Sequence, residues 1–317
     1  MRHSRRQRPT AAKESQRWLD AQAAIQEGVP PGVAVLTVAD REANIYDRFA
    51  LPRPPQHELL IRATQNRGIG EEAGHLWDAA EQATVGEIVP VLVARRADRE
   101  PREALLALRW TPVTLLPPRN RAGRARLPVV PVVTILAEEP RPPAGEKPIR
   151  WLLLTTRAVA TGEAALACVR AYACRWLIER YHFALKSGCR VAELQLRTAA
   201  RLERALALCA IVAWRLLWLT YLARTDPDQP CTVALTTAEW QVLLALTQPP
   251  LPLPARPPPL GQAVRAIARL GGFLGRADDG APGVTVLWRG LRRLEDLALG
   301  WQVAQHHAAP APFRTCG

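Results

Sequence analysis

Lysine is scarce in this sequence, although the chain is strongly basic. Only Lys13, Lys147 and Lys186 are lysines among 42 basic residues, and the formal net charge is +13. Such a charge favours a polyanionic partner, most often nucleic acid, but an arginine-rich codon bias would give the same composition. Lys186 is informative by its position, because a compact ammonium is not equivalent to a guanidinium.

Paired cysteines and long uninterrupted apolar runs are also missing. The six cysteines, at positions 168, 174, 189, 209, 231 and 316, include no CxxC pair, which favours reduced thiols over a disulfide framework or a zinc site. The longest apolar stretch, ALALCAIVAWRLLWLTYL, is interrupted by Arg215, so we expect a buried helix and no membrane segment. The basic N-terminus lacks the apolar core of a signal peptide, which predicts a cytoplasmic protein.

The remaining composition is that of a globular protein with one large or two ordinary domains. The chain has 317 residues, of which 48% are hydrophobic and 22% charged, which is typical of a chain with a real core.

The stretch VAVLTVAD predicts a buried strand ending at Asp40, and open α/β sheets place active sites at the carboxyl ends of strands. Between residues 56 and 146, short β-rich runs alternate with turns and predict an antiparallel β insertion. Its turn RNRAGRAR is either a phosphate-contacting loop or a solvated hairpin tip.

A specific pattern of polar residues occurs within YACRWLIERYHFALKSGCR, residues 172–190. Four residues follow the spacing Y-x2-R-x3-E-x6-K: Tyr172, Arg175, Glu179 and Lys186. On a regular helix they fall within an arc of ~60°, so that all four side chains project from one stripe. A second, mostly apolar stripe can face a core; it consists of Cys174, Ile178, Tyr181 and Leu185. A simpler interpretation of Glu179 is an intrahelical partner of Arg175, four residues earlier.

The motif and its flanking segments RWLIE and ALKSG resemble the signature of the insertion sequence 4 family of DDE transposases, which includes the transposase of transposon five. The likeness extends to VADREANIYDRFA, LAEEPRPPAGEKPIRWLLLT and AIARLGGFLGR, and runs from roughly residue 10 to residue 305. The spacing and the LGGF segment make another phosphodiesterase of the same fold, or a basic structural protein without a site, less favoured interpretations.

The resemblance implies an α/β fold with a ribonuclease-H-like catalytic core, incomplete because its first strands are missing, an antiparallel β insertion and a C-terminal helical region. The expected parts are a partial core with the second catalytic aspartate, the insertion, the remainder of the core with the catalytic glutamate, and a helical dimerisation region. They correspond to residues 1–55, 56–146, 147–225 and 226–317.

The resemblance also implies a metal centre. Asp40 and Glu179 match the second and third carboxylates that hold two Mg²⁺ ions, for which Mn²⁺ can substitute. Two such ions activate a water or a DNA 3′-hydroxyl and stabilise the leaving oxygen of a phosphodiester displacement. Asp40 and Glu179 are therefore the expected catalytic and metal-binding residues.

DNA is the partner that the resemblance implies, both as transposon ends and as target. Tyr172, Arg175 and Lys186 match residues that hold DNA phosphates. Trp151 matches the position that stacks on a base flipped out of the duplex, although a core tryptophan at a strand start is the simpler alternative. Arg62 and Arg67 match basic positions that face DNA. A bacterial, nucleoid-associated protein without membrane contact is expected, as a homodimer or a heterodimer with full-length transposase.

The first catalytic aspartate of the family has no counterpart in this sequence. Glu14, Asp20 and Glu27 are the only acidic residues before Asp40, and Asp20 lies inside a helix that the resemblance already matches. We therefore expect an N-terminally truncated transposase that does not cut DNA alone. The alternative is a non-catalytic DNA-binding and dimerising protein that modulates a full-length transposase.

Overall fold

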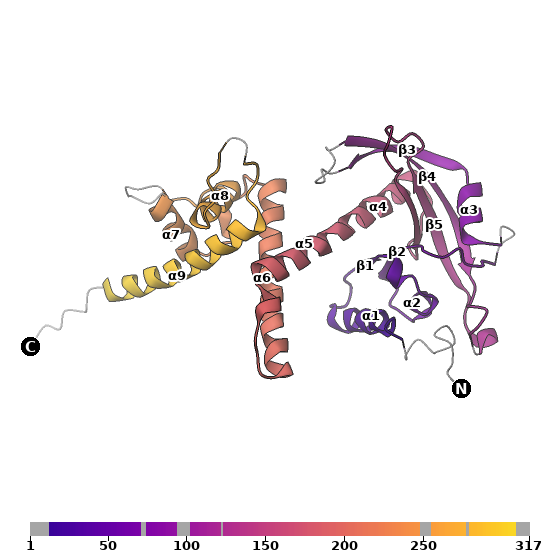
Figure 1. The fold of residues 1–317 in the computed structure, drawn as a ribbon, viewed down its shortest axis with the longest axis horizontal. Coiled ribbons are helices and arrows are strands. Elements are labelled where there is room, and N and C mark those ends of the chain that lie inside the picture. Colours follow the sequence, from indigo (N-terminus) through magenta and orange to yellow (C-terminus); the bar gives the residue numbers. More distant parts are fainter. Residues whose placement is uncertain are drawn as a thin grey trace, which may run out of the picture. The chain divides into compact units, whose positions relative to one another are not determined.

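Contacts within the chain group it into two units, Met1–Arg175 and Trp176–Gly317. The structure, a computed structural model, describes residues 13–70, 74–93, 102–121, 123–247, 255–276 and 279–308. The first unit is mixed α/β and the second is helical (Figure 1). The mixed α/β class is therefore confirmed, while the four expected parts of the chain stay a prediction.

The first unit alternates strands and short helices. Its elements are α1 (Gln16–Gly28), β1 (Val35–Ala39), η2 (Arg41–Ala43), α2 (Tyr46–Ala50), β2 (His57–Arg62), α3 (Leu76–Gln82), β3 (Val85–Val93), β4 (Arg102–Leu115), η3 (Arg124–Arg126), β5 (Val130–Glu138), β6 (Arg150–Thr155), α4 (Gly162–Ala173) and η4 (Cys174–Trp176).

The six strands form one sheet with the order β1-β2-β6-β5-β4-β3. The antiparallel pairing predicted for the β-rich segment is confirmed for β3, β4 and β5. The strand β2, however, pairs in parallel with β1 and antiparallel with β6. The strands of the expected insertion therefore belong to the same sheet as β1, the strand that is followed by Asp40.

Alternating side chains of the central strands supply two cores, one on each face of the sheet. Leu59 and Ile61 of β2 pack with residues of α2 and α3, whereas Leu60 packs on the opposite face with Cys168 and Val169 of α4. The alternation follows from the two-residue period of a strand. The central strands are therefore buried on both faces of the sheet, and α4 packs on the face opposite α2 and α3.

The second unit is built from helices that follow α4 and η4 along the chain. They are α5 (Leu177–Phe183), the π-helical segment η5 (Ala184–Gly188), η6 (Val191–Glu193), α6 (Ala199–Thr225), η7 (Cys231–Val233), α7 (Thr237–Thr247), α8 (Leu260–Leu270) and α9 (Val284–Ala308). One core joins them, with Leu216, Leu243, Ile267 and Leu294 fully buried. The five described cysteines are free thiols, as expected.

Two apolar helical surfaces are less buried than the sequence suggests. In the second stripe of the motif, Tyr181 and Leu185 pack against the helical core, but Cys174 is exposed and Ile178 is 48% exposed. The expectation of a buried helix is also wrong for most of α6, because only 22% of its most apolar window is buried. By length and composition alone, this helix could cross a membrane. Apolarity on several sides of a helix does not reveal which side is covered.

The start of α7 is held by a reciprocal cap between Thr236 and Glu239. The Glu239 amide donates to Thr236 Oγ1 at 3.3 Å, and the Thr236 amide donates to Glu239 Oε2 at 2.7 Å. This arrangement satisfies helix N–H groups that would otherwise lack partners.

We expect Thr236→Ala to lower the free energy of unfolding by about 1 kcal/mol, because the helix loses its capping oxygen. Urea unfolding followed by circular dichroism measures the change. Thr236→Ser keeps the hydroxyl and serves as the control. Equal midpoints for all three proteins would mean that the cap does not stabilise α7.

Candidate functional site around Asp40

Asp40 and Arg175, which are far apart in the sequence, face one another in the first unit. Asp40 follows β1 and caps η2, because its Oδ1 accepts a hydrogen bond from the Arg41 amide at 2.6 Å. Arg175 Nη1 lies 3.8 Å from Asp40 Oδ2. The Asp40 side chain is 46% exposed and that of Arg175 24% exposed. A carboxylate and a guanidinium predicted to act on the same DNA are thus brought together at the end of a strand.

Trp151 and Tyr172 form a second contact between predicted residues. Their rings meet edge to face, with centroids 5.2 Å apart and an interplanar angle of 66°. Tyr172 is only 4% exposed, and Trp151 is half-buried at the start of β6. Tyr172 and Arg175 are one helical turn apart along α4 and η4, so the aromatic pair and the Asp40 pair belong to one region of the first unit. Stacking of a DNA base on Trp151 stays a prediction.

Arg62 and Arg67 anchor the chain beside two of these residues. Arg62 donates to the carbonyl of Arg150, next to Trp151, at 3.2 Å. Arg67 donates to the carbonyl of Asn44, four residues after Asp40, and burial lowers its pKa to about 10. These contacts give both arginines a structural task within the protein. Their contact with DNA stays a prediction.

Two residues around Asp40 were not singled out from the sequence. Thr64 donates from its hydroxyl to the carbonyl of Arg41 at 3.0 Å. Asn44 is 5% exposed, and its side-chain amide has no hydrogen-bond partner among the described residues. The contacts of Thr64 and Arg67 with η2 and Asn44 connect the segment after β2 to the segment after Asp40. No local pattern in RATQNRG indicates such a contact.

Glu179 and Lys186 lie in the second unit, on α5 and η5, and both are exposed. Between Tyr172 and Lys186 the chain passes through the 3₁₀ turn of η4 and the π turn of η5. A constant rotation of about 100° per residue therefore does not describe the motif, since 3₁₀ and π turns advance by other angles. The shared stripe and the roles of Glu179 and Lys186 stay predictions.

A metal centre would need several oxygen ligands close together, because two-metal sites are held mainly by carboxylates. Among the residues that the structure describes, no group of three His, Cys, Asp or Glu side chains lies close enough to hold an ion. Asp40 has a guanidinium at 3.8 Å. Asp40 belongs to the first unit and Glu179 to the second, so the two-ion site that both would help to form stays a prediction.

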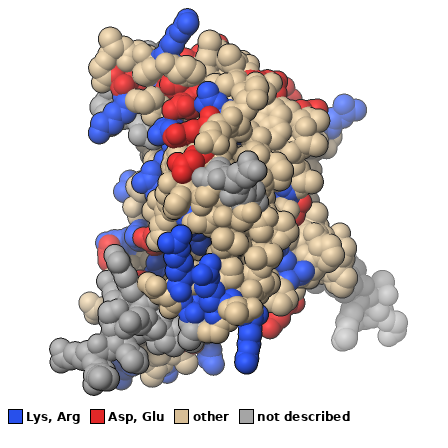
Figure 2. All heavy atoms as spheres, turned by 90° about the vertical axis from the view of Figure 1, so that its right-hand side faces the viewer, with Lys and Arg blue, Asp and Glu red and all other residues tan. Residues whose placement is uncertain are grey.

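Basic side chains are numerous on the face of the protein that Figure 2 displays. A group of lysine and arginine side chains lies in the lower middle of this face and others lie along its upper edge, whereas acidic side chains lie mainly in the upper half. In the turn RNRAGRAR, Arg121 pairs with Asp47 at 2.6 Å, and Arg124 Nε donates to the Pro117 carbonyl at 3.2 Å. Arg119 and Arg126 are exposed. The turn is therefore fixed to the protein by two arginines and presents two others to solvent.

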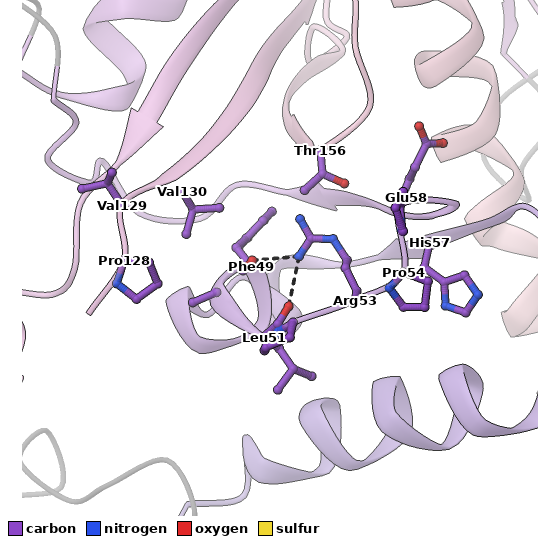
Figure 3. A pocket seen from close by; sticks show the side chains of 13 residues that line it. Phe49, Leu51, Arg53, Pro54, His57, Glu58, Pro128, Val129, Val130 and Thr156 are labelled. Carbon is purple, nitrogen blue, oxygen red and sulfur yellow. Dashed lines mark hydrogen bonds between the residues drawn. The ribbon is translucent and has the colours of Figure 1, made fainter. Parts of the chain in front are cut away.

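A separate pocket of about 400 Å³ lies in the first unit between the segment around Arg53 and the start of β5 (Figure 3). Arg53 donates to the carbonyls of Phe49 and Leu51 at 2.8 and 3.4 Å, and burial lowers its pKa. Glu58 is paired with Arg157 at 2.6 Å. None of the eight predicted site residues lines this pocket, so it is not the site that the motif indicates.

Part of the second unit is similar to a known protein family. Residues 211–309 match the family model of the Tn5 transposase dimerisation domain. The match covers less than a third of the chain and includes the C-terminal half of α6 and the helices α7, α8 and α9. It supports a Tn5-like transposase family and the oligomerisation expected for the C-terminal region.

Proposed function

We propose that the chain is a DNA-binding, self-associating protein of the DDE transposase type, with a ribonuclease-H-like first unit. The observation that carries the proposal is the match of residues 211–309 to the Tn5 transposase dimerisation domain. The sequence motif of Tyr172, Arg175, Glu179 and Lys186 is consistent with it, because this motif resembles the same group of enzymes.

The surroundings of Asp40 support a role in holding DNA. Arg175 can offer a guanidinium to a phosphate beside a strand end, and the half-buried Trp151, whose ring packs against the buried Tyr172, lies in the same region. A net charge of +13 supplies the long-range attraction that draws a protein to DNA. Transposon ends and target DNA are the proposed ligands.

We derive no cleavage step for this chain, because its described residues lack a group of three metal ligands. The second candidate function is a non-catalytic partner that forms mixed dimers with a full-length transposase, and the match to a dimerisation domain is compatible with it. When bound in a complete enzyme, Mg²⁺ or Mn²⁺ would supply the activation of the attacking oxygen. Asp40 and Glu179 are the residues that would contribute to holding it.

We expect the purified chain to bind duplex DNA without nicking it. Binding is measured by fluorescence anisotropy at increasing salt, where the affinity should fall steeply because phosphate contacts release counterions. Nicking is measured on supercoiled plasmid and on duplexes with terminal repeats in Mg²⁺.

Binding that is absent at low salt would contradict the proposal. A Mg²⁺-dependent nick that Glu179→Gln abolishes would show instead that this chain has a complete catalytic site. Co-purification with an intact transposase would favour the modulating role.

A further inference from the structure

Two cysteine side chains meet in the second unit, where the segment after α5 packs against α6. Cys189 follows the π-helical segment η5, and Cys209 lies on α6, 20 residues further along the chain. The Cys189 thiol donates a hydrogen bond to the backbone carbonyl of Cys209, with the sulfur 3.5 Å from the oxygen. The Cys209 thiol also lies within hydrogen-bonding reach of the Cys189 thiol. The fold therefore places two sulfur atoms side by side, although the sequence has no CxxC pair.

Neighbouring contacts hold the two segments that carry these thiols together. Tyr181 of α5 donates from its hydroxyl to the carbonyl of Ala210, the residue after Cys209, at 3.3 Å. Ala184, the first residue of η5, is fully buried in the same core as Leu216 of α6. The proximity of the two thiols therefore comes from packed helices on both sides, so that the sulfur atoms are already close before any reaction takes place.

Access to solvent distinguishes this pair from the other described cysteines. Cys168 and Cys231 are fully buried, whereas Cys174 is exposed. Cys189 and Cys209 are partly buried. A small molecule can reach a thiol of this kind, whereas a second protein chain is less able to do so. The pair therefore combines a fixed separation with access for a small reactant.

We propose that Cys189 and Cys209 form an oxidative modification site, at which hydrogen peroxide joins the two thiols in a disulfide within one chain. The peroxide first oxidises the Cys209 sulfur to a sulfenic acid and leaves as one water molecule. The Cys189 sulfur then attacks the sulfenic sulfur, so that the S–S bond forms, the S–O bond breaks and a second water molecule leaves. In total, two thiols and one peroxide give one disulfide and two waters. The inference does not depend on the proposed function.

The surroundings of Cys189 assign the two roles. Burial, together with the neighbouring Cys209, raises the pKa of the Cys189 thiol to about 11. Because the thiolate is the form that reacts with oxidants, Cys189 is a poor first target and serves as the resolving thiol. Its fixed position beside Cys209 favours the disulfide over further oxidation of the sulfenic acid. In a reducing compartment both thiols stay free, so the reaction is expected only when an oxidant is present.

The disulfide would fasten the end of the motif segment to α6. Lys186 lies on η5, immediately before Cys189, and the loop that the disulfide closes contains η6 and the beginning of α6. Closing a loop restricts the unfolded chain, which stabilises the folded one. We therefore expect oxidation to raise the thermal unfolding midpoint of the second unit by about 5–10 °C.

Peptide mapping of the full chain tests the proposal. The protein is reduced with dithiothreitol, freed of the reductant and treated with hydrogen peroxide, and the remaining thiols are alkylated before trypsin digestion without reduction. Trypsin releases SGCR with Cys189 and ALALCAIVAWR with Cys209. We expect mass spectrometry to find these two peptides linked, with a mass two hydrogens below their sum. Dithiothreitol should separate them and reverse the rise of the unfolding midpoint.

Serine variants identify the thiols that react. Cys189→Ser and Cys209→Ser should each abolish the linked peptides and the rise of the midpoint on oxidation. Cys174→Ser is the matched control, because it removes an exposed thiol outside the pair, and it should leave both effects unchanged. If a serine variant fails to fold, the peptide map of the parent protein still decides the question.

Three results would overturn the inference while the proposed function stands. Alkylated Cys189 and Cys209 in a sample whose Cys174 is oxidised would show that peroxide does not reach the pair. A sulfinic acid at Cys209 without linked peptides would show that Cys189 does not resolve the sulfenic acid. A disulfide-linked dimer on a non-reducing gel, lost in Cys209→Ser, would show that the thiol pairs between chains.

Discussion

Replacement of Gly290 by alanine is expected to lower the free energy of unfolding of the second unit by about 1–3 kcal/mol. Gly290 lies on α9 where this helix crosses α8. An added Cβ would lie 1.8 Å from the carbonyl oxygen of Ile267. Gly271, after α8, makes the reciprocal contact, since a Cβ there would lie 1.8 Å from the carbonyl oxygen of Val286. The two backbones therefore meet directly.

A backbone carbonyl cannot move aside as a side chain can, so the clash must separate α8 from α9 or bend one of them. Urea unfolding measured by circular dichroism gives the loss of stability. Gly300→Ala is the matched control on the same helix, because nothing lies within 4 Å of its added Cβ. There alanine should stabilise α9 by up to about 1 kcal/mol through helix propensity. Equal effects of the two substitutions would mean that the helices are not in backbone contact.

The local elements of the fold were predictable because each has a local signal. The apolar run before Asp40 forms β1, and the long apolar stretch interrupted by Arg215 forms part of the helix α6. Turn residues and apolar periodicity decide such elements within a few positions. The position of Asp40 at the end of a strand followed from the same reasoning.

Pairing and exposure could not be predicted in the same way, because they depend on residues far away in the sequence. ELLIRAT has the composition of any buried strand, and nothing in it indicates parallel pairing with β1. The apolar stretch of α6 gave no sign that the side bearing Trp214 stays exposed, whereas the side bearing Leu216 is buried.

The candidate site shows the same limit. The spacing of Tyr172 and Arg175 is local, so a shared region was expected from the motif. The proximity of Arg175 to Asp40 depends on how α4 and η4 lie relative to β1, across 135 residues of sequence. The departure from a regular helix at η4 and η5 also has no clear signal in RWLIERYHFALKSG. Propensities differ too little between helical types to predict such turns.

Replacement of Asp40 by asparagine is expected to raise the affinity of the chain for duplex DNA about tenfold in EDTA, a change of about 1.4 kcal/mol. Without a bound cation, the partly exposed carboxylate of Asp40 repels phosphates and holds the guanidinium of Arg175 at 3.8 Å. Asparagine removes the negative charge that competes with a phosphate for Arg175, and an arginine can form paired hydrogen bonds to a phosphate. Its side-chain oxygen can still accept the hydrogen bond from the Arg41 amide.

The sign of this change distinguishes two roles of Asp40. If Asp40 only stabilised the fold around η2, the substitution would leave the affinity unchanged or lower it. Asp78→Asn is the matched control, because it removes the same charge from a similarly exposed carboxylate on α3. Fluorescence anisotropy titrations at two salt concentrations measure both variants. The increase in affinity should be larger at low salt, since repulsion between exposed charges is screened by ions. It should disappear in the double variant Asp40→Asn/Arg175→Ala if Asp40 acts through Arg175. An equal increase in both Asp variants would reduce the effect to net charge and remove the Asp40–Arg175 pair from the proposed DNA site.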